Sequence, residues 1–217
     1  MCYTCVRECP AKAIQVLDSQ ASVVSSRCIG CGNCIRVCSQ KAKRVESTLP
    51  QVMELLSGDE PVAAIVAPSF PAEFSDIPFE TFVGMLKAVG FSHVFEVSFG
   101  ADMVAREYLK VLEDNPDRSY IATTCPAIVS YVQKYHPDLV EHLMPVVSPM
   151  IATARVARKV IGKPCRVVFL GPCIAKKEEA RQDEVEQDVD EALTFTELRT
   201  LFDTVAPDNI DPQLFDE

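Results

Sequence analysis

The sequence lacks the features that would carry a protein into or across a membrane. No apolar run approaches the roughly 20 residues that a membrane-spanning helix needs. There is also no signal peptide, so the ten Cys residues are not expected to form disulfides. These absences favour a cytoplasmic protein whose reduced thiols bind metal.

Histidine is scarce as well. The three copies, His93, His136 and His142, show no ligand spacing, so ordinary surface or core roles are expected. Hydrophobic residues are plentiful at 48%, which argues against overall disorder. The length of 217 residues suits one medium domain and a small one.

Most of the Cys residues gather near the N-terminus. The stretch Cys28-Ile-Gly-Cys31-Gly-Asn-Cys34-Ile-Arg-Val-Cys38 has the spacing C-x2-C-x2-C-x3-C. Four thiolates at this spacing are typical of a [4Fe-4S] cubane. Zinc is the alternative, although structural zinc prefers two well-separated Cys pairs.

The motif occurs twice, which indicates a duplicated unit. The residues equivalent to Cys31, Cys34 and Cys38 lie 29 positions earlier and are Cys2, Cys5 and Cys9. The equivalent of Cys28 would precede Met1. We therefore expect Met1 to be a late start and the first ligand of the first motif to be missing.

Two-cluster ferredoxins exchange their fourth ligands between the two motifs. By this rule the complete ligand set is Cys9, Cys28, Cys31 and Cys34. The set that lacks one ligand is Cys2, Cys5 and Cys38. One cluster should be well held and the other labile or missing.

Charge is divided unevenly between these motifs and the rest of the chain. Residues 1–48 carry seven Lys/Arg against three Asp/Glu, and the remainder carries 14 against 28. The segments therefore have net charges of +4 and −14. The basic excess suits anionic clusters. Nucleic-acid binding is the alternative, but the acidic remainder would repel phosphates.

After Thr48 the pattern of apolar residues alternates between strands and helices. The expected strands span 62–67, 91–97, 119–123 and 166–170. The expected helices span 79–86, 104–112, 127–134, 148–161 and 195–204. This order predicts an α/β domain at 49–217, with a parallel sheet and flanking helices, preceded by a small ferredoxin-like iron–sulfur domain at 1–48.

Two stretches of this second domain carry no expected element. The acidic stretch 176–191 is interpreted as a solvated loop or helix face. The tail after Val205 shows no clear element.

Three further Cys residues lie in the predicted α/β domain. Cys125 and Cys173 each follow a predicted strand, so both are expected at the carboxyl rim of the sheet, where ligands bind. Lys176 would favour a thiolate or an anionic ligand there. Packed core thiols are the alternative, and that is the expected role of Cys165 at the opposite end of its strand.

Several motifs together resemble the [FeFe]-hydrogenase large-subunit family over nearly the whole chain. Thr123-Thr124-Cys125-Pro126-Ala127 and Gly171-Pro172-Cys173-Ile174-Ala175-Lys176-Lys177 are similar to two of its active-site motifs. Val66-Ala67-Pro68-Ser69, the stretch Phe95–Asp102 and Ser148-Pro149-Met150 resemble further family segments.

The resemblance implies roles for individual residues. Cys125 and Cys173 would ligate the cubane of the hydrogen-activating cluster. Lys176 would hydrogen-bond a cyanide on the attached di-iron unit, and Pro68 and Ser69 would line the pocket.

The sequence also departs from the family. Thr124 stands where the family has a proton-relaying thiol, and its hydroxyl titrates too high for a rapid relay. Ile128 stands where Trp is usual. No Cys follows Cys173, so only two of the four ligands of a cubane are present, and we expect a fragment that is inactive by itself.

Three functions stay open. The first is a fragment of a redox- or hydrogen-sensing protein that transfers electrons to a redox partner or an attached signalling domain. The second is a hydrogenase, an oxidoreductase whose third Cys motif lies beyond this chain and which would hold the di-iron cluster. The third is a non-enzymatic iron–sulfur assembly or carrier protein.

Overall fold

The computed structural model describes residues 2–183, 185, 187–205 and 210–216. The expectation of a late start concerns Met1, which lies outside these residues. In the described part of the chain, no helix is both long enough and apolar enough to span a bilayer.

The N-terminal segment contains a hairpin and two short helices. Its two strands pair antiparallel, and Asp18 and Ser19 at the turn have φ angles of 46° and 64°. Two positive φ angles are characteristic of the tight turn that matches the twist of a hairpin. The elements are α1 (Thr4–Arg7), β1 (Ile14–Leu17), β2 (Gln20–Val23), η1 (Ser25–Arg27) and α2 (Asn33–Arg36).

The duplication predicted from the sequence is visible in the backbone. Helices α1 and α2 begin 29 residues apart, and each follows a left-handed residue, Tyr3 or Gly32. Lys12 and Lys41, also 29 residues apart, have φ angles of 47° and 49°. The two motifs therefore share one local conformation.

The second part of the chain is built on a four-stranded parallel sheet, as predicted. The strand order is β4-β3-β5-β6, and all three pairings are parallel. The central strand β3 is buried at every residue because it consists of Val, Ala and Ile alone. The strands are β3 (Val62–Val66), β4 (His93–Glu96), β5 (Arg166–Gly171) and β6 (Glu191–Thr194).

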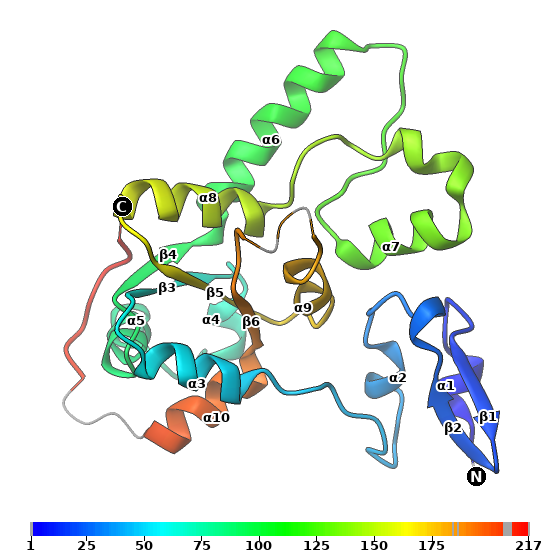
Figure 1. Cartoon of the computed structure of the whole chain (residues 1–217), viewed down its shortest axis with the longest axis horizontal. Helices are drawn as coiled ribbons and strands as arrows, with labels where there is room; N and C mark the ends of the chain where they lie inside the picture. The colour runs from blue at the N-terminus through cyan, green and yellow to red at the C-terminus, as the bar shows by residue number, and fades with distance from the viewer. Residues whose placement is uncertain (1, 184, 186, 206–209, 217) are drawn as a thin grey trace.

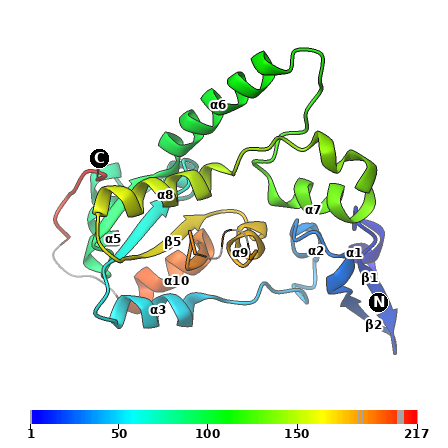
Figure 2. The same cartoon turned by 45° about the horizontal axis from the view of Figure 1, so that its top comes forward.

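Helices cover both faces of this sheet (Figures 1 and 2). Helix α8 lies on one face, with α6 crossing it, and α3 and α10 lie on the other. The outer half of α6 projects away from the sheet (Figure 1). The helices are α3 (Leu49–Ser57), α4 (Phe70–Glu73), α5 (Phe79–Ala88), α6 (Val97–Asp114), α7 (Pro126–Tyr135), η2 (Pro137–His142), α8 (Pro149–Ile161), α9 (Ala175–Ala180) and α10 (Phe195–Val205).

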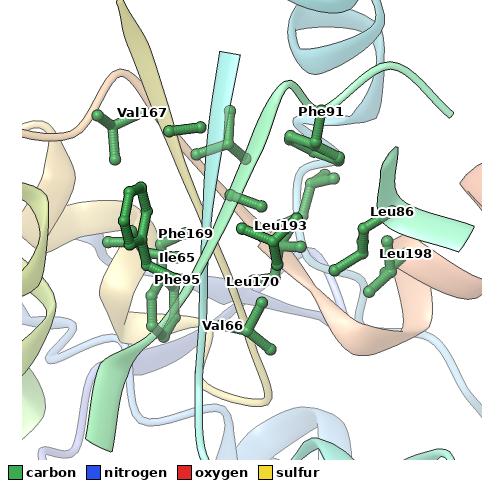
Figure 3. Packing of buried hydrophobic residues seen from close by; sticks show 14 of the residues in the cluster. Ile65, Val66, Leu86, Phe91, Phe95, Val167, Phe169, Leu170, Leu193 and Leu198 are labelled. Carbon is green, nitrogen blue, oxygen red and sulfur yellow. The ribbon is translucent and has the colours of Figure 1, made fainter. Parts of the chain in front are cut away.

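The main hydrophobic core lies between the sheet and these helices (Figure 3). In Figure 3, Val66, Leu170 and Leu193 of the sheet lie toward Leu86 of α5 and Leu198 of α10. Ile65, Val167 and Phe169 lie on the other side. Aromatic rings extend the core: Phe70 stacks on Phe82 at 4.7 Å, and Phe74 meets Phe195 edge-on at 5.6 Å between centroids. Cys165 is buried here as an ordinary packed thiol, as expected.

The strand predicted at Ser119–Thr123 is wrong. Ile121 makes only an isolated bridge to Leu143, outside the sheet. The 18-residue helix α6 is about 27 Å long, so it carries the following segment away from the sheet. Thr123 instead donates from its backbone N–H to the Tyr108 hydroxyl at 2.9 Å.

The interpretation of 176–191 as a solvated loop or helix face is also wrong for much of that stretch. Lys176, Lys177 and Glu179 of α9 are buried, and Glu191 begins strand β6. Glu184 and Glu186 lie outside the described residues. The prediction relied on the high content of charged residues in this stretch. Charged residues are usually exposed, and the sequence does not show which of them are buried in ion pairs.

Candidate metal centre

The four thiols of the predicted complete set lie near one another. Burial raises the pKa of the Cys34 thiol, and the neighbouring thiols of Cys28, Cys31 and Cys9 raise it further, whereas Lys43 lowers it. Cys9 also belongs to the small buried cluster of the N-terminal segment, against which Cys28 and Cys34 pack. The fold therefore brings Cys9 from the first motif to the three leading Cys residues of the second.

Backbone amides point at the sulfurs. The N–H of Ala13 donates to Cys9 Sγ at 3.3 Å, and the N–H of Gly30 donates to Cys28 Sγ at 3.4 Å. The repeat equivalent of the first contact is Ala42 donating to Cys38 Sγ at 3.3 Å. Such donors stabilise negative charge on sulfur and so favour thiolate ligands.

Two glycines allow the loop between Cys28 and Cys34 to turn. Gly30 and Gly32 have φ angles of 70° and 73°, a conformation that side chains disfavour. A Cβ on Gly32 would also come within 3.0 Å of Ile174 Cδ1. The loop is therefore shaped to lie closely against the residues just before α9.

Helix α7 joins the N-terminal segment to the rest of the molecule. The Tyr135 hydroxyl lies 2.8 Å from the carbonyl oxygen of Ala11 and 2.7 Å from that of Arg27. Lys134 donates to the carbonyl oxygen of Cys28. Sequence patterns gave no indication of these contacts, because they join residues more than 100 positions apart.

One thiol of the complete set, Cys31, borders the same hollow as Cys173. A cavity of about 680 Å³ is lined by Cys31 and Gly32 on one side and by Pro172 and Cys173 on the other. Cys31 is exposed and Cys173 half-buried. The two parts of the chain thus face each other at their cysteines.

The segment around Cys125 reaches the same region through Lys176. This lysine is only 8% exposed and its Nζ lies 2.5 Å from Glu179 Oε2 and 3.4 Å from the carbonyl oxygen of Thr124. Its backbone N–H donates to the carbonyl oxygen of Cys173 at 3.2 Å. Lys176 therefore connects the loop of Thr124 and Cys125, both exposed, to the start of α9.

Pro68 and Ser69 are exposed at the carboxyl end of β3, next to the end of β5. The N–H of Ala67 donates to the carbonyl oxygen of Leu170 at 2.8 Å. A Cβ on Gly171 would come within 3.0 Å of Ala67 Cβ. Pro68, which follows Ala67, and Pro172, which follows Gly171, therefore leave the sheet next to each other. This is the edge that carries Cys173.

Glu197 was not identified from the sequence, yet it joins three segments of the chain. Its carboxylate accepts from Lys177 Nζ at 2.7 Å, from the N–H of Thr48 at 2.9 Å and from the Thr194 hydroxyl at 2.6 Å. Burial by itself raises the pKa of Glu197, but these hydrogen bonds outweigh it and lower the pKa to about 2. Thr194 and Glu197 have the spacing of a helix-capping box, which was the available sequence signal.

The remaining predicted residues are more dispersed. Cys2 is exposed, Cys5 buried and Cys38 half-buried, in the backbone positions equivalent to Cys31, Cys34 and Cys9. His93, His136 and His142 are all partly exposed. Among the described residues, no three His, Cys, Asp or Glu side chains are grouped closely enough to hold a single metal ion.

The residues of the complete set fit a cubane, which is bound by thiolates at separate corners rather than at one point. Four neighbouring thiols are present, with amides donating to the sulfurs of Cys9 and Cys28. Cys125 and Cys173 fit less well, because two thiols are only half of the ligands that a cubane needs.

Each of the two parts of the chain matches the model of a known family. The family model described as "Iron only hydrogenase large subunit, C-terminal domain" matches residues 60–217. The model described as "4Fe-4S dicluster domain" matches residues 1–39.

The names of individual relatives indicate two different functions, cluster assembly and hydrogenase activity. The cytosolic Fe-S cluster assembly factor NAR1 of Yarrowia lipolytica is 28% identical over 82% of this chain and 43% of its own length. The NADP-reducing hydrogenase subunit HndD of Solidesulfovibrio fructosivorans is 26% identical over 84% of this chain and 36% of its own. The chain thus spans less than half the length of either relative.

A solved structure shares the fold. The [FeFe]-hydrogenase HydA1 of Chlamydomonas reinhardtii superposes with a TM-score of 0.70 at 22% identity. The match covers 79% of this chain and 51% of the other.

Proposed function

Because the chain belongs to the iron-only hydrogenase large-subunit family, we propose that it transfers electrons between a two-cluster ferredoxin-like domain at residues 1–48 and a hydrogenase-like domain at residues 49–217. The cavity shared by Cys31 and Cys173 is the observation that carries this proposal. It places Cys31, one thiol of the complete set, next to the hydrogenase-like edge of the sheet.

Cys9, Cys28, Cys31 and Cys34 would hold the [4Fe-4S] group, which supplies one-electron redox chemistry when bound. Ala13 and Gly30 donate their amides to the thiolates and thereby stabilise their charge. Lys43 adds a positive charge near Cys34. Cys2, Cys5 and Cys38 would form a second, weaker site with three ligands.

At the hydrogenase-like edge, Cys125 and Cys173 would serve as metal ligands and Lys176 as a hydrogen-bond donor, with Pro68 and Ser69 beside them. Buried Lys176 is already hydrogen-bonded to Glu179, so its ammonium is held in place. Thr124 supplies a hydroxyl rather than a thiol, which suits slow sensing of redox state or hydrogen better than rapid turnover.

Iron analysis of anaerobically purified protein tests the electron-transfer role. We expect about four irons per chain and one reduced-cubane signal in electron paramagnetic resonance after dithionite reduction. About eight irons would mean that a second site also holds a cluster. Zinc in place of iron would contradict the proposal.

Two matched variants test the exchange of ligands between motifs. Cys9→Ser should abolish the reduced-cubane signal, because Cys9 lies with Cys28, Cys31 and Cys34. Cys38→Ser should preserve it. The reverse pattern would show that each motif ligates its own cluster.

A second candidate is a non-enzymatic role in iron–sulfur cluster assembly. The support for it is the similarity to an assembly factor over 82% of this chain. Infrared spectroscopy distinguishes the roles, because a di-iron hydrogen-activating cluster shows cyanide and carbon monoxide bands. Stoichiometric bands in the matured full-length protein would exclude the assembly role.

A third candidate, a working hydrogenase, is supported by the similarity to the subunit of Solidesulfovibrio fructosivorans. Hydrogen evolution that survives Thr124→Ala in the full-length protein would favour a proton route that bypasses this position. No activity after full maturation would rule the candidate out. The location we propose is the cytoplasm, on the basis of the similarity to the cytosolic assembly factor.

A further inference from the structure

Helices α6 and α8 carry exposed apolar side chains close to the point where they cross. On α6, Phe99 is 59% exposed and Met103 is 38% exposed. On α8, Val160 is 53% exposed, and Val156, one turn earlier, is half-buried. Single exposed apolar residues are common on protein surfaces, whereas a group of them on two touching helices indicates an interaction surface. We call these four residues the apolar stripe.

Two hollows lie beside the apolar stripe, and Val156 borders both of them. The larger has a volume of about 510 Å³ and is lined by Phe99 and Val160, together with the buried ring of Phe95. The smaller has a volume of about 270 Å³ and is lined by Met103. Each hollow is bordered by residues of both helices, so the stripe forms one continuous surface.

The larger hollow is acidic. The carboxylates of Glu96, Asp102 and Asp216 line it, and among the described residues no Lys or Arg does. Asp216 pairs with Lys87 at 3.1 Å. Glu96 and Asp102 take part in none of the ion pairs of the described structure, so their charge is available to another molecule.

The smaller hollow is basic. Arg155 and Lys159 line it, and its one carboxylate in the described structure, Glu107, already pairs with Lys110 at 2.6 Å. Arg155 pairs with Asp188, whereas Lys159 is exposed and takes part in none of the ion pairs of the described residues. The two sides of the apolar stripe thus carry opposite charges that lack partners.

A surface with an acidic side and a basic side is complementary to a second copy of itself. In a two-fold dimer the axis can lie in the plane of contact and run along the apolar stripe. The acidic hollow of each copy then faces the basic hollow of the other, and the two stripes meet in the middle. Asp102 of one copy faces Lys159 of the second copy, and symmetry makes this contact twice.

We propose that this face of α6 and α8 joins two copies of the chain in a symmetric dimer. Burial of the apolar stripes would drive association, and the hollows of opposite charge would fix its register. The inference goes beyond the proposed function and does not depend on bound iron. A partner of uniform charge would satisfy only one of the two hollows, which favours a second copy of this chain.

The dimer face is separate from the candidate metal centre. Among the described residues, none that lines either hollow also lines the cavity of Cys31 and Cys173. In both views α6 and α8 lie apart from the hairpin of β1 and β2 (Figures 1 and 2). Variants of the face therefore test association without changing the predicted metal ligands.

Sedimentation velocity of the anaerobically purified, iron-loaded full chain is the first test, with a thiol reductant present to prevent crosslinking through exposed Cys residues. We expect a dimer at micromolar concentrations. Phe99→Glu places two charges at the centre of the interface and should raise the dissociation constant at least about 30-fold. Leu17→Glu is the control, because Leu17 is 57% exposed but lies on β1, and it should leave the constant unchanged. Val160→Glu is a second test variant if Phe99→Glu fails to fold.

A charge exchange is the second test. Asp102→Lys and Lys159→Asp each replace two attractions by two repulsions, and each should raise the dissociation constant about tenfold. The double variant Asp102→Lys/Lys159→Asp restores opposite charges and should return the constant to within about threefold of the wild type.

Three results would overturn the proposal. They are a wild type that stays monomeric, which would leave this face to a different partner, a double variant that is no tighter than the single ones, and equal effects of Phe99→Glu and Leu17→Glu. A dimer that binds no iron would contradict the electron-transfer function and leave the dimer face standing.

Discussion

Glu197 shows how much one residue contributes to holding the two parts of the chain together. It accepts hydrogen bonds from Thr48, just before α3, from Lys177 of α9 and from Thr194 at the end of β6. Lys177 also donates to the carbonyl oxygen of Glu46 at 2.9 Å. The linker after the ferredoxin-like segment is thereby attached to the sheet edge near Cys173.

We predict that Glu197→Gln lowers the free energy of unfolding at pH 7 by about 2–3 kcal/mol, because a buried lysine loses its charged partner. Urea unfolding measures the change. Glu107→Gln is the control, because Glu107 is exposed and, among the described residues, its one ion pair is with exposed Lys110. This change should cost less than about 0.5 kcal/mol. Equal losses in both variants would contradict the role assigned to Glu197.

The effect of Glu197 should depend on pH. Its pKa falls from 4.5 to about 2 on folding, so the carboxylate stabilises the protein fully above about pH 5. That stabilisation is lost as the pH falls through the folded pKa. We therefore expect the gap in unfolding free energy between wild type and Glu197→Gln to narrow from pH 7 to pH 3, and a gap independent of pH would refute the assignment.

At the scale of elements, the crossing of α6 and α8 depends on close approach at Gly100. A Cβ at this position would lie 2.6 Å from the carbonyl oxygen of Pro149 and still closer to Thr153 Oγ1. Because a backbone atom is involved, one helix must move to accommodate any side chain.

We predict that Gly100→Ala lowers the free energy of unfolding by about 1–3 kcal/mol through overpacking. Gly58→Ala is the matched control, because its Cβ would meet nothing closer than Leu55 O at 3.4 Å. Thermal or urea unfolding of the pair is the measurement. Similar stabilities would mean that α6 and α8 separate easily.

Helix α7 is the element that fastens the ferredoxin-like segment to the rest. We predict that Tyr135→Phe, which keeps the ring but removes the hydroxyl, costs about 1–2 kcal/mol because the carbonyls of Ala11 and Arg27 lose their donor. Hydrogen exchange should speed up in residues 2–48 and change little in the sheet.

Tyr131→Phe is the control for this element. Its ring packs against the same small core and stacks on Tyr135 at 5.3 Å between centroids, but its hydroxyl makes no hydrogen bond within the described structure. If both variants loosened residues 2–48 equally, the Tyr135 hydroxyl would not be the attachment point.

At the scale of the molecule, the two parts have very different cores. The sheet and its helices bury a large cluster of Val, Ile, Leu and Phe. The buried residues of the N-terminal core are two Cys, two Ala and two Ile, namely Cys5, Cys9, Ala11, Ala13, Ile14 and Ile29. So small a core depends on bound metal for much of its stability.

We predict that removing iron with a chelator unfolds residues 2–48 and leaves the sheet folded. Hydrogen exchange should show protection lost in β1 and β2 but retained in β3 and β5, with most far-ultraviolet circular dichroism preserved. Simultaneous loss of protection in β3 would show instead that the two parts unfold as one unit.

Local patterns in the sequence by themselves determined the two Cys motifs, their repeat and three of the four sheet strands. Cys spacing, the alternation of apolar runs and breakers such as Gly90 act within a few residues, so they can be read without knowing the fold.

Only the tertiary structure decided what depends on distant contacts. Because α6 is long, Ser119–Thr123 lies outside the sheet. Because buried Lys177 pairs with Glu197, part of the stretch that was predicted to be solvated instead supports the site. The cavity between Cys31 and Cys173 joins residues 142 positions apart, a distance over which local sequence carries no signal.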